Sequence, residues 1–274
     1  MKKKVLGLAT CFNRVSNTKE CITSLIQGNP NLQFDFIIVD DGSTDGTLEM
    51  LNKYKCVDVI QGTGNLFYSG GMRIAIEKAK TTKYDSFEYI MLFNDDVRFF
   101  CNSIEKLIES NKNDSSIMVG ATCDTNGIMS YSGCVHTSQY KPSYRNVMST
   151  ETEEAYCDTF CANCVLIPRN IFVGLDNIDP KYRHAMGDFD YGWSAHNRGY
   201  KILSSSFFVG ECNDNPVTGT WRDTSLSIRE RIRKKESIKG LPRKEWFYYL
   251  HKNHGIICAI IFSVTPYIKI LLRK

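Results

Sequence analysis

The sequence predicts an α/β fold in which helices flank a mostly parallel central sheet. Between residues 5 and 79, apolar runs alternate with amphipathic segments in the order strand, helix, strand, helix, strand, loop, helix. This order implies parallel strands joined by right-handed crossovers. The run at residues 36–39 breaks abruptly into Asp40, as expected where a buried strand opens into a loop. Open α/β sheets bind ligands at that edge, so we expect the functional site there.

Each expected element follows from its own local pattern. Apolar runs predict strands at residues 5–10, 34–39, 56–60, 89–93, 117–121 and 201–209, with a further apolar stretch at 160–167. The weak, polar pattern of residues 122–154 predicts a hairpin or an insert rather than a linker. Helical spacing, as in Cys21, Ile22, Leu25 and Ile26, and stop signals such as Gly199 predict helices at residues 18–27, 47–54, 72–79, 103–111, 169–175 and 188–199.

Length and composition indicate a globular protein. The 274 residues suffice for one large domain with an appendage, and 42% hydrophobic with 23% charged residues is ordinary. The net charge of +4 is mild, and we expect no nucleic-acid partner. The N-terminal apolar run is too short for a secretory signal, and eleven cysteines without one suggest free thiols in a reducing cytosol.

The C-terminal part differs in character, so we expect a main domain at 1–210 and a helical extension at 211–274. Eight basic residues stand against two acidic ones from Arg229 to Lys244. An aromatic cluster at 245–254 and a short apolar run at 255–264 follow. The apolar run is about half the roughly 20 residues that span a bilayer. One interpretation is a membrane-surface anchor, and the other is a helix packed on the core or on a second subunit of a homodimer.

Acidic residues follow a second predicted strand. Asp95 and Asp96 come directly after the run at 89–93, preceded by Asn94. Adjacent carboxylates repel each other and stay ionised more easily beside a cation. Hard oxygen ligands without histidine or cysteine suit Mg²⁺ or Mn²⁺. The alternative is a solvated acidic turn.

Three further features allow a ligand but do not require one. Gly70 and Gly71 precede the predicted helix at 72–79, so backbone N–H groups could face an anion. A zinc site at residues 157–164, which hold three cysteines, would need a fourth ligand that is not evident, and buried core cysteines are favoured. His251 and His254 lie on one helical face, either as a metal pair or as packed side chains.

With these pieces in order, the chain resembles the family 2 glycosyltransferases, whose fold is called GT-A. The resemblance spans residues 5–208. Residues 10–14 look like the family's first nucleotide loop, and residues 39–47 (VDDGSTDGT) are close to its most specific signature. Residues 64–72 resemble a loop of bacterial rhamnosyl- and galactofuranosyltransferase-like members.

Two acidic motifs extend the resemblance, with departures. Residues 94–96 stand where the family has its Asp-x-Asp metal motif, although Asn94 replaces the first Asp. Residues 187–190 stand where it has Glu-Asp-x-Asp, although Gly187 replaces the Glu. The family's later metal-ligating histidine is not evident. These departures leave open a second hypothesis, a sugar-nucleotide-binding protein without transfer activity.

The resemblance implies an inverting transfer from a nucleotide-diphospho-sugar to a hydroxyl of a glycan or lipid-linked acceptor. Asp188 would be the general base, and Asp96 with Asn94 would hold Mg²⁺ or Mn²⁺. The resemblance implies a role in bacterial surface polysaccharide synthesis. We expect a cytoplasmic protein that could associate peripherally with the inner face of the plasma membrane. Expected donor contacts are Thr10, Asn13, Asp40, Asp41, Asn65, Gly71, Arg73 and Asp95, and expected acceptor contacts are His184, Asp190 and Trp193.

Overall fold

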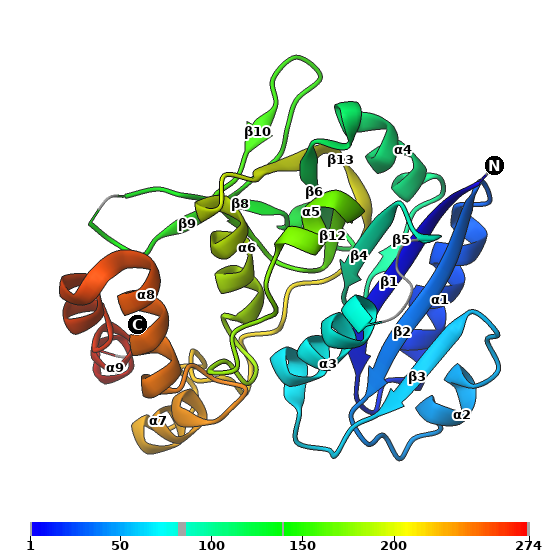
Figure 1. The fold of residues 1–274 in the computed structure, drawn as a ribbon. Helices are drawn as coiled ribbons and strands as arrows, with labels where there is room; N and C mark the ends of the chain where they lie inside the picture. The colour runs from blue at the N-terminus through cyan, green and yellow to red at the C-terminus, as the bar shows by residue number, and fades with distance from the viewer. Residues whose placement is uncertain (1, 82–85, 139, 273–274) are drawn as a thin grey trace.

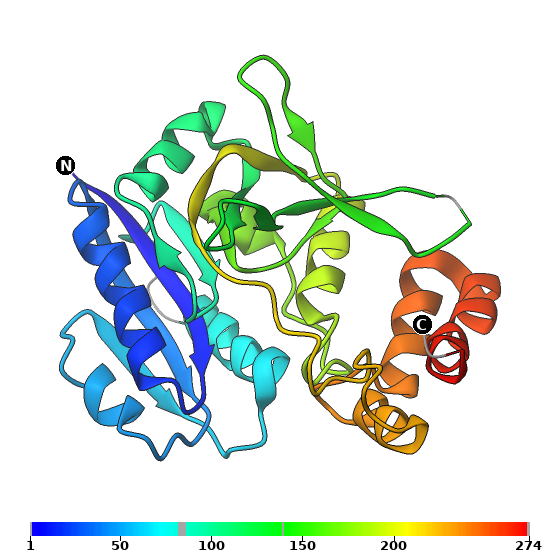
Figure 2. The same cartoon turned by 180° about the vertical axis from the view of Figure 1, so that it is seen from behind.

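A computed structural model describes residues 2–81, 86–138 and 140–272 as an α/β fold (Figures 1 and 2). Its main sheet has ten strands, with the order β10-β13-β6-β12-β4-β1-β2-β3, and β5 and β7 pair at its margin. A smaller sheet has the order β11-β8-β9. The strands are β1 (Lys3–Cys11), β2 (Leu32–Asp40), β3 (Val57–Gln61), β4 (Tyr89–Phe93), β5 (Arg98–Phe99), β6 (Ser116–Cys123), β7 (Met129–Tyr131), β8 (Gly133–His136), β9 (Tyr144–Val147), β10 (Ala155–Tyr156), β11 (Thr159–Phe160), β12 (Cys164–Pro168) and β13 (Lys201–Glu211).

The main sheet is mixed: four of its strand pairs are parallel and five are antiparallel, but the parallel pairs, as predicted, hold most of the paired residues. β1 lies parallel between β2 and β4, β2 pairs parallel with β3, and β13 pairs parallel with β6. β12 alone among the central strands runs antiparallel to both neighbours. The helices are α1 (Val15–Gly28), α2 (Thr47–Leu51), α3 (Phe67–Thr81), α4 (Ser103–Ser110), α5 (Arg169–Gly174), α6 (Gly187–Asn197), α7 (Ile228–Glu236), α8 (Arg243–Phe262) and α9 (Thr265–Leu271), with a 3₁₀ turn at Lys112–Asp114.

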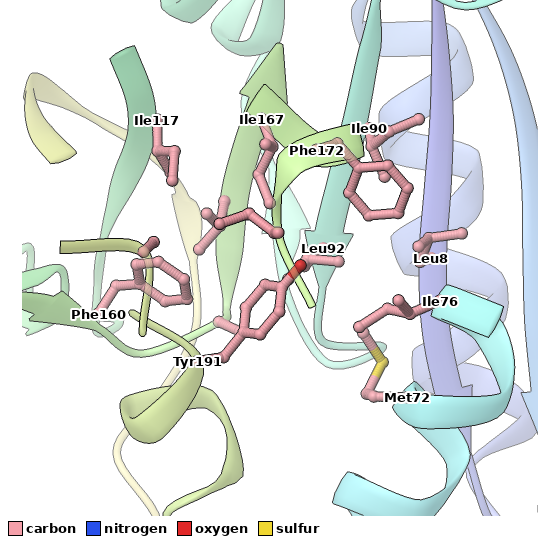
Figure 3. Close-up of a cluster of buried hydrophobic side chains, with 14 of the residues drawn as sticks. Leu8, Met72, Ile76, Ile90, Leu92, Ile117, Phe160, Ile167, Phe172 and Tyr191 are labelled. Atoms are coloured by element: carbon pink, nitrogen blue, oxygen red, sulfur yellow. The ribbon is translucent and has the colours of Figure 1, made fainter. Parts of the chain in front are cut away.

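The central strands are buried on both faces, which explains why they are continuous apolar runs. In β1, Leu8 faces a core shared with α3, α5 and α6, whereas Ala9 faces a core shared with α1, α2 and α4. Figure 3 shows the first of these cores, where Met72 and Ile76 of α3 approach Leu8 from one side. The two cores fix the sheet between two helical layers and so hold the carboxyl ends of its strands in place.

The predicted insert at 122–154 forms short hairpin strands. β7 pairs antiparallel with β6, and β8 pairs antiparallel with β9. β11 pairs with the other edge of β8 and completes the small sheet. The chain then re-enters the main sheet at β12. The hairpin interpretation is therefore confirmed for the described residues.

The C-terminal helices pack on α6 at the end of the molecule away from α1 and α2 (Figure 1). Tyr249 and Leu250 of α8 are buried there. The buried Asp190 of α6 accepts hydrogen bonds from Lys252 Nζ at 2.7 Å and from Asn253 Nδ2 at 2.9 Å. The C-terminal extension is therefore bonded to α6, a helix that packs against the main sheet. The boundary at residue 210 stays a prediction.

One helix begins earlier than predicted. α3 starts at Phe67 rather than at residue 72, because the carboxylate of Asp41 accepts from the N–H groups of Leu66 and Phe67 at 2.9 and 3.0 Å. Free N–H groups at a helix start favour such an acceptor. Gly70 and Gly71 consequently lie inside α3, and the expectation that they precede the helix and face an anion is wrong.

Candidate active site

A cavity of about 560 Å³ opens where the carboxyl ends of β1, β2 and β4 meet the start of α6. It brings together acidic side chains from segments far apart in the sequence. Of the predicted site residues, Thr10, Asp41, Asn94, Asp95, Asp96, His184 and Asp188 line it. The convergence of Asp41, Asp96 and Asp188 around one cavity is the arrangement on which the enzymatic interpretation depends.

Asp41 forms part of the wall by holding the loop between β3 and α3. Besides its bonds to the start of α3, its Oδ1 accepts from Gly64 N at 2.8 Å. A Cβ at Gly62 would come within 2.7 Å of the same oxygen, so the loop needs a glycine there to approach so closely. Since both carboxylate oxygens serve the protein backbone, the first role of Asp41 is to shape the cavity.

Asp40 and Asn13 connect loops and do not line the cavity. Asp40 is buried, and its Oδ1 accepts from Ser43 N at 3.0 Å. Asn13 N donates to Ser43 Oγ at 2.8 Å, and Asn13 Oδ1 accepts from Thr44 N at 2.8 Å. The predicted contact of Asp40 with a nucleotide is thus corrected, because its side chain points into the turn after β2.

Thr10 and Gly71 meet where β1 packs against α3. Thr10 Oγ1 donates to Val39 O at 3.0 Å, and a Cβ at Gly71 would lie 2.2 Å from that hydroxyl. Gly71 therefore allows close packing, and it is not among the residues that line the cavity. Thr10 keeps its predicted place at the cavity.

Arg14 bridges the two acids that follow β4. Its Nη1 lies 2.7 Å from Asp96 Oδ2 and 3.3 Å from Asp95 Oδ1. Thr18 donates to the other oxygen of Asp95 at 2.8 Å. Burial raises the pKa of Asp95 to about 6, and the Arg14 guanidinium opposes that rise. The two carboxylates stand against one guanidinium and are largely enclosed at the cavity, so they do not form a solvated turn.

These residues fit a hard divalent cation with the help of a substrate. Among the described residues, no three His, Cys, Asp or Glu side chains gather closely enough to enclose a metal ion. Asp96 and Asn94 nevertheless offer oxygen donors at the cavity beside Asp95. Mg²⁺ usually takes one or two carboxylates and completes its coordination with phosphates and water. Among the described residues, no such group includes the cysteines at 157–164 or the pair His251 and His254.

Asp188 lies in the first turn of α6 and faces the cavity. Its Oδ2 accepts from Ala162 N at 3.1 Å and its Oδ1 from Phe189 N at 2.9 Å. Burial raises the pKa of Asp188 above its usual 3.8, while these N–H groups lower it. A held carboxylate with a raised pKa is suited to accept a proton.

Two neighbours of Asp188 complete this side of the cavity. His184 Nδ1 accepts from Tyr68 N at 3.5 Å, and burial lowers the pKa of His184, so the neutral imidazole is favoured. The hydroxyl of Tyr68 is buried and has no hydrogen-bond partner among the described residues. Because a buried unpaired hydroxyl is unfavourable, its place at a cavity points to a ligand that pairs with it.

Four predicted contacts lie elsewhere. Arg73 Nη1 donates to Tyr182 O at 2.8 Å and so supports the loop before α6. Asp190 is buried with Lys252, and Trp193 Nε1 donates to Tyr144 OH at 2.9 Å in an aromatic cluster. Asn65 is exposed on the loop before α3. None of the four is among the residues that line the cavity.

The lining residues that sequence reasoning did not assign include Arg14, Tyr68 and Lys239. Arg14 belongs to the loop after the first strand. Its positive charge, at a strand end expected to lie near the acidic motif, was a signal that could have identified it. Lys239 comes from the basic segment between α7 and α8, about 50 residues from Asp188. Tyr68 gave no signal, because its role depends on the burial of one hydroxyl.

A mostly parallel sheet with an acidic cavity at its strand ends defines a ligand-binding α/β enzyme. The family model described as Glycosyl transferase family 2 matches residues 8–172, which is more than half of the chain. The chain therefore belongs to glycosyl transferase family 2 and is a glycosyltransferase. A search of curated protein sequences found no match.

Solved structures support the GT-A fold. The mannosyltransferase PcManGT from Pyrobaculum calidifontis, in complex with GDP-Man and Mn²⁺, has a TM-score of 0.56 at 10% identity and covers 100% of this chain and 74% of that one. S. aureus TarS has a TM-score of 0.58 at 15% identity, covering 96% and 44%. Residues 1–349 of TarS in complex with UDP-GlcNAc give 0.56 at 15% identity, covering 96% and 74%. At these identities the likeness concerns the fold.

Proposed function

We propose that this glycosyltransferase moves a sugar from a nucleotide-diphospho-sugar to a hydroxyl group, with inversion at the anomeric carbon. The observation that carries the proposal is the shared cavity of Asp188 and the pair Asp95–Asp96. A held carboxylate on one side suits a base for the acceptor, and a negative centre on the other suits a cation for a diphosphate. Related structures hold GDP-Man with Mn²⁺ and UDP-GlcNAc, which supports this class of donor.

In this mechanism the acceptor hydroxyl approaches Asp188, which takes its proton as the new glycosidic bond forms. The attack comes from the face opposite the leaving nucleoside diphosphate, so the configuration inverts. The backbone N–H groups of Ala162 and Phe189 keep the carboxylate pointing at the cavity. Thr10 and Asp41 line the donor side, and neutral His184 lies beside the acceptor side.

Asp96 and Asn94, with Asp95 beside them, would hold Mg²⁺ or Mn²⁺, which neutralises charge on the leaving diphosphate when bound. Two cationic side chains of the chain itself, Arg14 and Lys239, also line the cavity. They attract the phosphates and balance their charge. We further propose a bacterial surface polysaccharide as the product, because residues 64–72 resemble the loop of the rhamnosyl- and galactofuranosyltransferase-like members.

The direct test is release of nucleoside diphosphate from a panel of nucleotide sugars, with and without Mn²⁺ or Mg²⁺. Glycan and lipid-linked acceptors with free hydroxyl groups are supplied in the same reactions. We expect release that requires both the acceptor and the ion. If a nucleotide sugar stabilises the protein thermally but none is consumed with any acceptor, the chain is a binding protein and the proposal is wrong.

Replacing Tyr68 by phenylalanine is expected to reduce kcat/KM by about tenfold or more without lowering the Tm. The hydroxyl has no hydrogen-bond partner among the residues that the structure describes, so its removal costs none of the bonds seen there. A bound sugar or phosphate that pairs with it would lose one. Steady-state kinetics and thermal unfolding of the two proteins test this, and an unchanged kcat/KM would contradict it.

The rate is expected to fall as the pH is lowered through the pKa of Asp188. Only the ionised carboxylate accepts a proton, and burial raises this pKa, so the midpoint lies above 3.8. His184 also lines the cavity and its lowered pKa contributes to the profile, whereas burial and their neighbours raise the pKa of Tyr68 and of Cys161, so both stay neutral over this range. The measurement is kcat against pH at saturating donor. A flat profile down to the pH of acid unfolding would exclude Asp188 as the base.

A further inference from the structure

The end of α8 and α9, with the residue after it, expose a series of large apolar side chains, which we call the 256–272 face. Its members are aliphatic and lie one or two helical turns apart. Ile257 is the most exposed at 71%. The full set is Ile256, Ile257, Ile260, Ile261, Val264, Ile268, Leu271 and Leu272. Soluble monomers rarely expose so many large apolar side chains together, so this face requires a partner.

The opposite sides of the same helices are packed, so the 256–272 face is not a loose end. Ala259 and Ile270 are fully buried. Trp246 Nε1 donates to Phe262 O at 3.2 Å, and Arg231 Nη1 donates to Ile270 O at 3.2 Å. The helices are therefore held in place with their apolar side chains exposed.

Their geometry suits lying on a bilayer rather than crossing it. The segment Arg243–Leu271 is long and apolar enough to span a membrane. However, Gly255 with φ of +85° breaks α8, and its first part is fixed to α6 through Lys252. Residues 256–262 and α9 form separate pieces of about 10 Å each. The hydrocarbon core is about 30 Å thick, so neither piece spans it.

The charge around the face selects an anionic lipid surface over a second copy of the chain. Residues 228–272 contain ten lysines and arginines against three glutamates, although Arg231 and Lys235 are buried and Lys252 pairs with Asp190. Arg243, Lys244 and Lys269 are exposed. Two copies facing each other would bring like charges together, whereas acidic lipid head groups complement them.

We propose that the 256–272 face docks onto an anionic lipid bilayer, with the aliphatic side chains in the head-group region and the basic residues at its edge. The same extension contributes Lys239 to the cavity. It also holds the loop of His184, because Arg183 Nε pairs with Glu245 Oε1 at 2.7 Å. The helices that carry the proposed docking face are thus part of a chain segment that also reaches the wall of the cavity. The docking does not depend on the proposed reaction.

The experiment is vesicle flotation of the full chain with phosphatidylcholine alone and with phosphatidylglycerol added. We expect binding to the anionic vesicles that weakens as salt is raised. The double variant Ile257→Ser/Ile261→Ser is expected to bind at least tenfold more weakly, because two exposed aliphatic side chains no longer enter the bilayer. The matched control Ile128→Ser/Val173→Ser alters side chains that are equally exposed but lie elsewhere, and it should bind as the wild type does.

Circular dichroism and thermal unfolding verify that both double variants fold. Sedimentation of the wild-type protein tests the alternative, in which a second copy of the chain covers the 256–272 face. A dimer that Ile257→Ser/Ile261→Ser converts to a monomer, without vesicle binding by the wild type, would assign the face to a second copy. Equal binding of both double variants to anionic vesicles would likewise overturn the proposal.

Discussion

Asp188→Asn is expected to lower kcat by roughly 10²–10⁴-fold, the usual contribution of a general base. The amide keeps the size of the side chain, and its oxygen still accepts from one backbone N–H group. It cannot take the proton of the acceptor hydroxyl. The measurement is kcat at saturating donor and acceptor.

Donor binding separates this loss from misfolding. Asp188→Asn should keep the thermal stabilisation given by the nucleoside diphosphate with Mn²⁺, since the carboxylate lies on the acceptor side. Asp58→Asn is a matched control, because Asp58 is an exposed acid on β3 that pairs with Lys78 at 3.6 Å. The control should retain full activity. Normal turnover by Asp188→Asn would remove Asp188 from the mechanism.

Asp96→Asn is expected to reduce kcat/KM by about 10²-fold or more, because stabilisation of the leaving diphosphate by a cation amounts to several kcal/mol. The ion concentration needed for half-maximal rate should rise at the same time. Titration of the rate with Mn²⁺ for the wild type, Asp96→Asn and Asp58→Asn measures both effects. An unaltered requirement for Mn²⁺ in Asp96→Asn would show that Asp96 does not hold the ion.

Sequence reasoning located the site because strand ends can be read from a sequence. Parallel strands deliver their carboxyl ends to one edge, so Asp41 after β2 and Asp95–Asp96 after β4 had to lie close together. Asp188 was assigned only through the family motif, since nothing in its local pattern brings the start of α6 to that edge. The fold class and the order of the elements followed from the same apolar runs.

Side-chain directions and distant partners could not be predicted. Asp40 and Asp41 are neighbours, yet only the second lines the cavity, because successive side chains at a strand end point to opposite sides. Gly71 was misassigned because the start of α3 depends on a carboxylate 26 residues earlier in the chain than Phe67. Arg73 bonds to Tyr182 and Asp190 pairs with Lys252, each more than 60 residues away, and no local signal indicates such pairs.

The contact between Asp190 and the C-terminal helices affects how this protein unfolds. Without Lys252 and Asn253, a carboxylate enclosed in α6 would have neither a counter-charge nor an amide donor, which is strongly unfavourable. Shortening the chain before α8 would therefore loosen the helix that begins beside Asp188. Because α8 is bonded to α6 in this way, we expect the C-terminal helices and α6 to unfold together.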